Sequence, residues 1–255
     1  MSILISIDNV QKMFGKGSNL VHAFGPVSLD IAEGQFVSLL GPSGCGKSTL
    51  MLMIAGLLEA TSGNVMLNGT TVDGPQTDIG IMFQDNTLVP WRTVRGNVEL
   101  QLEMRGLDTK AYSSRVLELL SQVKLSDFSN RFPHELSGGM QQRAAFCQAM
   151  VHNPRIMLLD EPLGKLDAMT RESIRGDLQA LWMTQRPTVL FVTHSIEEAV
   201  QLSSQVAVIT PRPGRIDRVI DIELPFPRDL AVKNSVEFTH YVRDIQEIFR
   251  GYGVL

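Results

Sequence analysis

The chain has 255 residues, a formal net charge of −4 at pH 7 and a hydrophobic content of 44%. This length is sufficient for one or two domains, and the composition excludes a disordered or fibrous chain. Because a dedicated nucleic-acid-binding protein is more often basic, the acidic balance argues against a nucleic-acid partner. The two cysteines, Cys45 and Cys147, are too few for a disulfide framework and indicate a reducing compartment.

The apolar segments are too short to cross a membrane. The longest of them, 50–58, has nine residues, whereas a membrane-spanning helix needs about 20. The apolar run at 3–7 has no basic residue before it, so it predicts a strand rather than a secretory signal. We therefore expect a soluble cytoplasmic protein.

Short apolar runs alternate with helical patterns along the chain. The runs at 36–40, 79–83, 156–159, 189–192 and 206–209 predict buried strands. Strands that are separated by helices are typical of parallel β-α units. The sequence therefore predicts an α/β fold.

Other segments depart from this alternation. Residues 47–58 predict a helix after the first of these strands. Residues 65–67 and 70–72 are joined by an Asn-Gly turn and predict a hairpin. Residues 93–151 are mostly helical in pattern, without a strong strand.

Two helix starts carry recognisable caps, one formed by Ser195 with Glu198 and one by Asn234 with Glu237. The helix after the second cap has an apolar face. We expect this face to pack on its own domain, with a partner-docking helix as the alternative. The residues of the face are Phe238, Val242, Ile245 and Phe249.

A glycine-rich segment between the strand at 36–40 and the next helix matches the pattern G-x-x-x-x-G-K-[ST]. Glycines let such a loop curl its N–H groups around phosphate oxygens, and the helix adds its positive N-terminal end. Lys47 would reach the β- and γ-phosphates, Ser48 would bind Mg²⁺, and Thr49 would bind the α-phosphate. Cys45 would fill space rather than act as a thiol. The matching residues are Gly41, Pro42, Ser43, Gly44, Cys45, Gly46, Lys47 and Ser48.

Two carboxylates follow the predicted strand at 156–159. Asp160 would lie beside the metal ion and anchor it, usually through water. Because side chains alternate along a strand, Glu161 would turn the other way or out into the site. There its carboxylate can accept a hydrogen bond from an attacking water.

A third motif precedes this acidic pair and consists of Leu136, Ser137, Gly138, Gly139, Met140, Gln141, Gln142 and Arg143. Together with Gln84, His194 and the two motifs above, it makes the chain resemble the nucleotide-binding subunit of an ABC transporter over about residues 7–220. The resemblance implies a P-loop NTPase cassette with a mostly parallel core sheet, an antiparallel β subdomain and a helical signature subdomain. It also implies that the chain binds ATP and Mg²⁺ and hydrolyses the ATP.

The resemblance assigns roles to single residues. Phe14 would stack on adenine, with a core residue as the alternative. Gln84 would contact Mg²⁺ and the attacking water. His194 would hold the γ-phosphate and the geometry around Glu161, and Asp167 would belong to a loop that contacts a neighbouring subunit.

The signature motif implies a dimer. Ser137 looks like a helix N-cap, so Ser137, Gly138 and Gly139 would direct a positive helix end at the γ-phosphate bound to the other subunit. The working state implied is a head-to-tail dimer, most simply a homodimer, that closes on two ATP molecules.

The sequence departs from the family pattern at two places. The fifth signature residue is usually glutamine and is Met140 here, where we expect a modest effect. The loop before Asp167 usually has a small residue and then alanine, but this chain has Gly164 and Lys165. The lysine can pair with an acid or perturb closure of the dimer, and both alternatives stay open. Because Glu161 and His194 remain, we expect an active site.

A Leu-x-Pro-Trp segment after Gln84 and the tail at 211–216 resemble importers for nitrate, sulfonate, taurine and related small anions. In that group the segment faces the membrane permease, so Trp91 is a candidate for the docking groove, with a core position as the alternative. The implied partners are permease subunits and, indirectly, a solute-binding protein. The implied location is peripheral, on the cytoplasmic face of the plasma membrane.

Other function classes fit less well. An exporter or lipid-transport ATPase of the same family is the main alternative. An ABC ATPase of DNA repair or translation would need a long coiled coil or a second cassette, and a non-catalytic member of a heterodimer is a third possibility. We assign residues 1–223 to one cassette, with its helical subdomain at about 89–151, and 224–255 to a C-terminal tail and helix.

Overall fold

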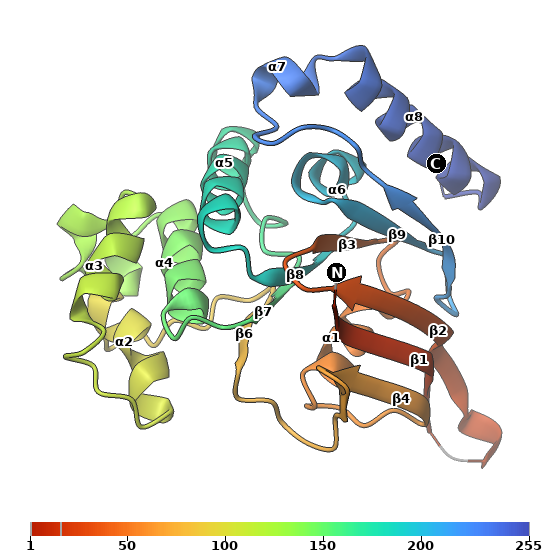
Figure 1. Cartoon of the computed structure of the whole chain (residues 1–255), viewed down its shortest axis with the longest axis horizontal. Coiled ribbons are helices and arrows are strands. Elements are labelled where there is room, and N and C mark those ends of the chain that lie inside the picture. Colours follow the sequence, from red (N-terminus) through yellow and green to blue (C-terminus); the bar gives the residue numbers. More distant parts are fainter. Residues whose placement is uncertain (1, 16, 255) are drawn as a thin grey trace. The chain divides into compact units, whose positions relative to one another are not determined.

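The computed structural model describes residues 2–15 and 17–254, and the chain divides into two compact units. Unit 1 comprises Met1–Gln76 and Thr188–Leu255, and unit 2 comprises Thr77–Pro187. Figure 1 traces the elements of both units along the chain, from red to blue. In the described ranges, no helix has both the length and the apolar character that a membrane span requires.

Unit 1 contains an antiparallel sheet of β2 (Val21–Ala32), β1 (Ile3–Phe14), β4 (Ser62–Leu67) and β5 (Thr70–Thr71), in this order. The predicted hairpin is confirmed as β4 and β5. The predicted strand at 3–7 is the first part of β1, which lies between β2 and β4. The sequence patterns missed β2, although Val27, Leu29 and Ile31 alternate with exposed residues there.

Unit 1 also contains four strands in the order β10 (Ile216–Asp221), β9 (Gln205–Ile209), β3 (Phe36–Leu40) and β8 (Thr188–Thr193). Strand β3 pairs in parallel with both β8 and β9, and β10 is antiparallel to β9. Every residue of β3 and β8 is buried, which is why these strands are continuous apolar runs in the sequence. Strand β10 was not predicted.

The helices of unit 1 are α1 (Lys47–Ile54), α6 (Ile196–Leu202), α7 (Leu230–Lys233) and α8 (Val236–Gly251). Helix α1 is shorter than predicted, because Gly56 adopts a φ of +70° soon after its end. The predicted cap at Asn234 is wrong by one residue. Ser235 caps α8, since its hydroxyl accepts from the N–H of Phe238 at 3.2 Å, whereas Asn234 ends α7.

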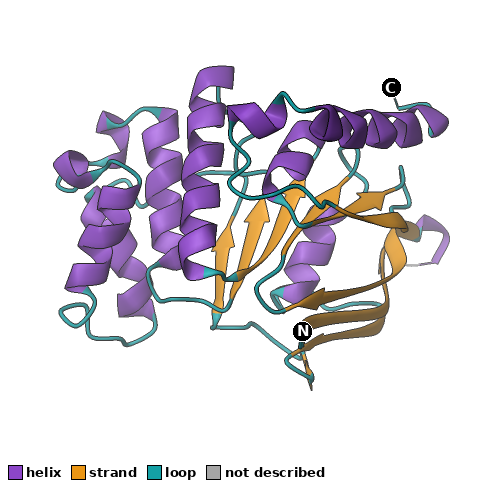
Figure 2. Ribbon diagram, turned by 45° about the horizontal axis from the view of Figure 1, so that its top comes forward, coloured by secondary structure: helices purple, strands orange, loops and turns teal. Residues whose placement is uncertain are grey.

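Helix α8 packs within unit 1, next to α6 and strand β9 (Figures 1 and 2). Its residues Phe238, Ile245 and Phe249 are buried in one cluster with Val206 and Val208 of β9. The prediction that the apolar face of the last helix packs on its own domain is therefore confirmed.

Arg228 joins the C-terminal segment to the end of α6. Its side chain is fully buried, and its Nη1 donates to the carbonyl oxygens of Val200 and Ser203, both at 2.6 Å. Its Nη2 donates to the carbonyl oxygens of Ile222 and Leu224, both at 3.0 Å. Burial lowers the pKa of Arg228 to about 10, so the guanidinium still carries its charge at neutral pH. A positive group at the end of a helix also complements the helix dipole.

Unit 2 contains two parallel strands, β6 (Ile79–Met82) and β7 (Ile156–Asp160). Its helices are α2 (Val94–Met104), α3 (Ser113–Gln122), α4 (Gly138–Met150) and α5 (Ala168–Gln185). Helices α2, α3 and α5 each pack against α4. The helical character predicted for 93–151 is confirmed. Short 3₁₀ turns lie at Ser126–Phe128 and Pro133–Glu135 in unit 2 and at Gly17–Asn19 in unit 1.

Candidate nucleotide-binding and hydrolysis site

The phosphate-binding loop in unit 1 connects the end of β3 to the start of α1. Gly44 and Gly46 have φ values of +77° and +102°, which residues with side chains rarely adopt. A Cβ atom at Gly46 would also lie 2.6 Å from Cδ2 of Phe24. The loop therefore requires glycine at these positions, as expected for a backbone that curls around phosphate oxygens.

Lys47 begins α1, and its side chain is buried against the loop. Its Nζ donates to the carbonyl oxygens of Gly41 at 2.8 Å and Pro42 at 3.0 Å. These acceptors are neutral, so a phosphate oxygen would form a stronger, charge-assisted hydrogen bond with the same ammonium group. Ser48 is exposed, and Cys45 is buried, as its expected space-filling role requires.

We expect Lys47→Ala to weaken ATP binding by about 10-fold to 100-fold, because a hydrogen bond to a charged group contributes about 1.5–3 kcal/mol. Equilibrium titration with ATP measures this change. Lys110→Ala is the control, since Lys110 is an exposed lysine of unit 2 and should leave the affinity unchanged. Equal affinities of the Lys47 variant and the unmodified chain would contradict the assignment.

The segment 211–216, which contains Gly214, lies against the phosphate-binding loop. The sequence did not indicate this contact. The carbonyl oxygen of Gly214 accepts from the N–H of Gly25 at 2.8 Å. A Cβ atom at position 214 would lie 2.0 Å from the carbonyl oxygen of Cys45. Only glycine permits this close approach, so Gly214 helps to fix the backbone of the loop.

Phe14 ends β1 in the same unit, and its side chain is 44% exposed. The Nζ atom of Lys12 lies 5.3 Å from the centroid of the Phe14 ring, within the range of a cation–π contact. The exposed ring is therefore not a core residue and is available for stacking, as the predicted role requires.

His194 follows the last residue of β8, and its side chain is exposed. The N–H of Gly41 donates to the carbonyl oxygen of Thr193 at 3.4 Å, which joins this strand end to the phosphate-binding loop. Ser195 caps α6 as predicted, with its Oγ accepting from the N–H of Glu198 at 3.4 Å. The carboxylate of Glu198 accepts from the Thr193 hydroxyl at 2.7 Å.

In unit 2, Gln84 and Glu161 lie together. Nε2 of Gln84 donates to Oε2 of Glu161 at 3.3 Å. Asp160 is the last residue of β7 and is buried, whereas Glu161 is only partly buried. Glu161 has a φ of +42°, a strained conformation for a residue with a side chain. This backbone geometry is consistent with a functional position, as the sequence predicts.

The signature segment begins α4. The Oγ of Ser137 accepts from the N–H of Met140 at 3.3 Å, so Ser137 is the predicted N-cap. A Cβ atom at Gly139 would lie 2.3 Å from Cγ2 of Thr170 in α5. Gly139 therefore also permits close packing of α4 against α5, a role that the sequence did not reveal.

Asp167 is the N-cap of α5. Its Oδ1 accepts from the N–H groups of Met169 at 3.1 Å and Thr170 at 3.0 Å. The hydrogen bond from the Thr170 backbone, with smaller contributions from other bonds, lowers the pKa of the Asp167 carboxyl. This capping role could have been found in the sequence, because aspartate is a preferred residue before a helix.

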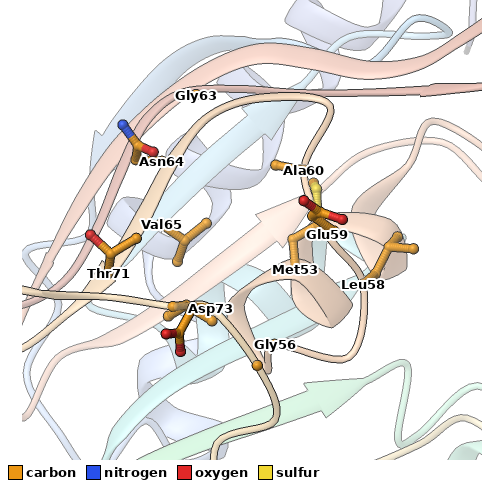
Figure 3. A pocket seen from close by; sticks show the side chains of 12 residues that line it. Met53, Gly56, Leu58, Glu59, Ala60, Gly63, Asn64, Val65, Thr71 and Asp73 are labelled. Atoms are coloured by element: carbon orange, nitrogen blue, oxygen red, sulfur yellow. The ribbon is translucent and has the colours of Figure 1, made fainter.

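A separate pocket of about 330 Å³ lies in unit 1, beyond the end of α1 (Figure 3). Its carboxylates, from Glu59 and Asp73, would repel phosphate groups. No residue of the phosphate-binding loop lines it, so it is not part of the candidate site. The lining residues are Met53, Gly56, Leu58, Glu59, Ala60, Gly63, Asn64, Val65, Thr71, Val72, Asp73 and Gly74.

Comparisons with known proteins identify the class. The family described as ABC transporter matches residues 24–164. An uncharacterized ABC transporter ATP-binding protein of Methanocaldococcus jannaschii is 42% identical over 250 residues, 98% of this chain and 92% of that protein. The taurine import ATP-binding protein TauB of Rhizobium johnstonii is 42% identical over 253 residues, 96% of each chain.

A solved structure has the same fold. It is the ATP-binding cassette MJ0796 in a dimeric post-hydrolysis state bound to ADP and Pi, with a TM-score of 0.75 and 33% identity over 87% of this chain and 100% of that one. The fold is thus an ATP-binding cassette with a mixed, mostly parallel sheet, an antiparallel β region and a helical region. The chain belongs to the ABC transporter family as an ATP-binding protein with an ATPase cassette.

Proposed function

We propose that this chain is the ATP-hydrolysing subunit of an importer for a small anionic solute of the taurine, sulfonate or nitrate kind. The observation that carries the proposal is its likeness, over nearly the whole length, to a protein named for taurine import. The aliphatic sulfonates import ATP-binding protein SsuB of Bacillus licheniformis is similarly related, with 41% identity over 228 residues.

The proposed chemistry is transfer of the γ-phosphoryl group of ATP to water. The carboxylate of Glu161 would orient the attacking water and accept its proton, and the amide of Gln84 would hold the same water. His194 would contact the γ-phosphate, and Lys47 would neutralise charge on the β- and γ-phosphates. Phe14 would stack on adenine.

Mg²⁺ fits the residues available to it. The Ser48 hydroxyl, the Gln84 side-chain oxygen and the Asp160 carboxylate are oxygen ligands of the kind that Mg²⁺ prefers. When bound, the ion would supply positive charge beside the phosphates. The exposed position of Ser48 at the start of α1 supports this assignment.

We propose that two copies of the chain form the working unit at the cytoplasmic face of the plasma membrane. Ser137, Gly138 and Gly139 of one copy would bind the γ-phosphate on the other, and Asp167 would contact that copy. Permease subunits would convert closing and opening of the pair into alternating access. Trp91 is 77% exposed, which supports its proposed contact with the permease.

The proposed domain division keeps residues 1–223 as the cassette, with its helical subdomain at about 89–151, and 224–255 as the tail and helix. The cluster that holds α8 against α6 and β9 supports attachment of the tail to the cassette.

The experiment uses the chain reconstituted in vesicles with its permease and a solute-binding protein. We expect taurine, an alkylsulfonate or nitrate to stimulate ATP hydrolysis and to accumulate inside, whereas an uncharged or cationic solute does neither. The reason for this expectation is the proposed coupling, in which the solute-loaded binding protein and the permease favour closing of the ATPase pair. Solute movement from the ATPase side of the membrane to the binding-protein side, or stimulation by lipid alone, would favour the exporter or lipid-transport alternative.

A further inference from the structure

Three consecutive side chains after β6 bind three different segments of unit 2. Gln84 donates to Glu161, which follows β7. Asp85 forms an ion pair with Lys165, in the loop that leads to α5. The Nδ2 of Asn86 donates to Oε1 of Gln141 in α4, at 2.5 Å.

The ion pair between Asp85 and Lys165 involves one of the two departures from the family pattern. Position 165 carries a lysine where alanine is usual, and the structure shows its Nζ beside Oδ1 of Asp85. The side chains of Lys165 and Asp85 are 64% and 86% exposed. Because exposed ion pairs add little to the free energy of unfolding, a role of this contact lies in positioning the two segments rather than in stabilising the fold.

The loop that carries Lys165 is stiffened by its own hydrogen bonds. The N–H of Gly164 donates to the carbonyl oxygen of Glu161 at 3.1 Å. Arg171 of α5 donates from Nη2 to the carbonyl oxygen of Leu166 at 2.8 Å and from Nε to that of Leu163 at 3.3 Å. Residues 161–167 are thus connected as one piece, and a restraint on Lys165 also restrains Glu161.

The direct contact between Gln84 and Glu161 is weak. Its donor–acceptor distance of 3.3 Å is longer than the most common distance in N–H···O hydrogen bonds, about 2.9–3.0 Å. A second contact between the same two segments therefore adds to what fixes their separation. The Asp85–Lys165 pair is that second contact, one residue from Gln84 and four from Glu161 along the chain.

We propose that Asp85 and Lys165 are positioning residues for ATP hydrolysis, whose ion pair holds the loop 161–167 so that Gln84 and Glu161 present their side chains together to the attacking water. This inference rests on the proposed role of Glu161. It concerns the chemical step, because neither Asp85 nor Lys165 belongs to the phosphate-binding loop.

The test measures kcat and KM for ATP separately, with the full chain. We expect Lys165→Met and Asp85→Asn each to lower kcat by about twofold to fivefold with KM unchanged, which is the range that an exposed ion pair can supply. Exchanging the charges, with Asp85→Lys and Lys165→Asp in one chain, should bring kcat back toward that of the unmodified protein. A merely structural role would not give this recovery at unchanged KM.

Glu103→Gln is the matched control. It removes a partly exposed ion pair of α2 in the same unit, between Arg92 Nη1 and Glu103 Oε2 at 2.8 Å, and should leave kcat and KM as they are. Thermal unfolding of each variant checks that all of them remain folded.

An unchanged or raised kcat in both single variants would overturn the inference, as would a rise in KM at constant kcat. A charge-exchanged chain slower than either single variant would also overturn it. Glu161→Gln is assayed alongside. If Glu161→Gln keeps turning over ATP, the proposed role of Glu161 fails; if it is inactive and Lys165→Met hydrolyses ATP normally, only the role of the ion pair fails.

Discussion

Replacing Glu161 by glutamine is expected to lower ATP turnover by about 100-fold to 10,000-fold, the contribution typical of a general base, while ATP still binds. An amide has nearly the shape of the carboxylate but cannot accept the proton of the attacking water. The phosphate-binding loop and Lys47 lie in unit 1 and are untouched by this change. The ATP-bound, closed dimer should therefore persist.

Two measurements on Glu161→Gln check this expectation. Single-turnover hydrolysis reports the chemical step, and size-exclusion chromatography with Mg-ATP reports the dimer. Lys47→Ala is the contrasting variant, because it should lose ATP binding and form no ATP-dependent dimer. Normal turnover in Glu161→Gln, or loss of ATP binding, would remove Glu161 from its proposed role.

Replacing Arg228 by methionine is expected to reduce the free energy of unfolding by about 3–5 kcal/mol, because it leaves several buried carbonyl oxygens without a donor and each such group costs about 1–3 kcal/mol. Methionine has a long side chain but no donors. The carbonyl oxygens of Val200 and Ser203 at the end of α6 would then be buried without the bonds that Arg228 supplies. Those of Ile222 and Leu224 would lose the same donor.

Urea unfolding of Arg228→Met measures the loss as a lower midpoint. Arg228→Lys is the control, since it keeps the charge but lacks the planar fork that reaches several carbonyl groups. Its urea midpoint should fall between those of Arg228→Met and the unmodified chain. An unchanged midpoint for Arg228→Met would show that the guanidinium does not stabilise the C-terminal segment.

Much of the fold follows from local patterns in the sequence. The run at 36–40 coincides with β3, because a strand buried on both faces is apolar throughout. Strand β2 was missed because Gly25 and Pro26 interrupt its alternation, and these residues are ordinary signals for a turn. The cap of α8 was displaced by one residue, since Asn234 and Ser235 are both good caps and only the backbone decides between them.

The candidate site was predictable where its residues are neighbours in the chain. The conformation of the phosphate-binding loop and the cap at Ser137 agree with the sequence motifs. Contacts between distant segments were not predictable, because spacing along the chain does not determine which side chains meet. The packing of Gly139 on Thr170 and the pairing of Lys165 with Asp85 are of this kind.

Gly214 affects the conformation of the phosphate-binding loop although it lies far from that loop in the sequence. Its missing side chain leaves space for the carbonyl oxygen of Cys45, so an added methyl group would displace the loop without changing any residue that faces ATP. We expect progressively larger side chains at position 214 to lower the affinity for the nucleotide progressively. Genetic variation at position 214 can therefore weaken nucleotide binding while the phosphate-binding and signature motifs remain intact.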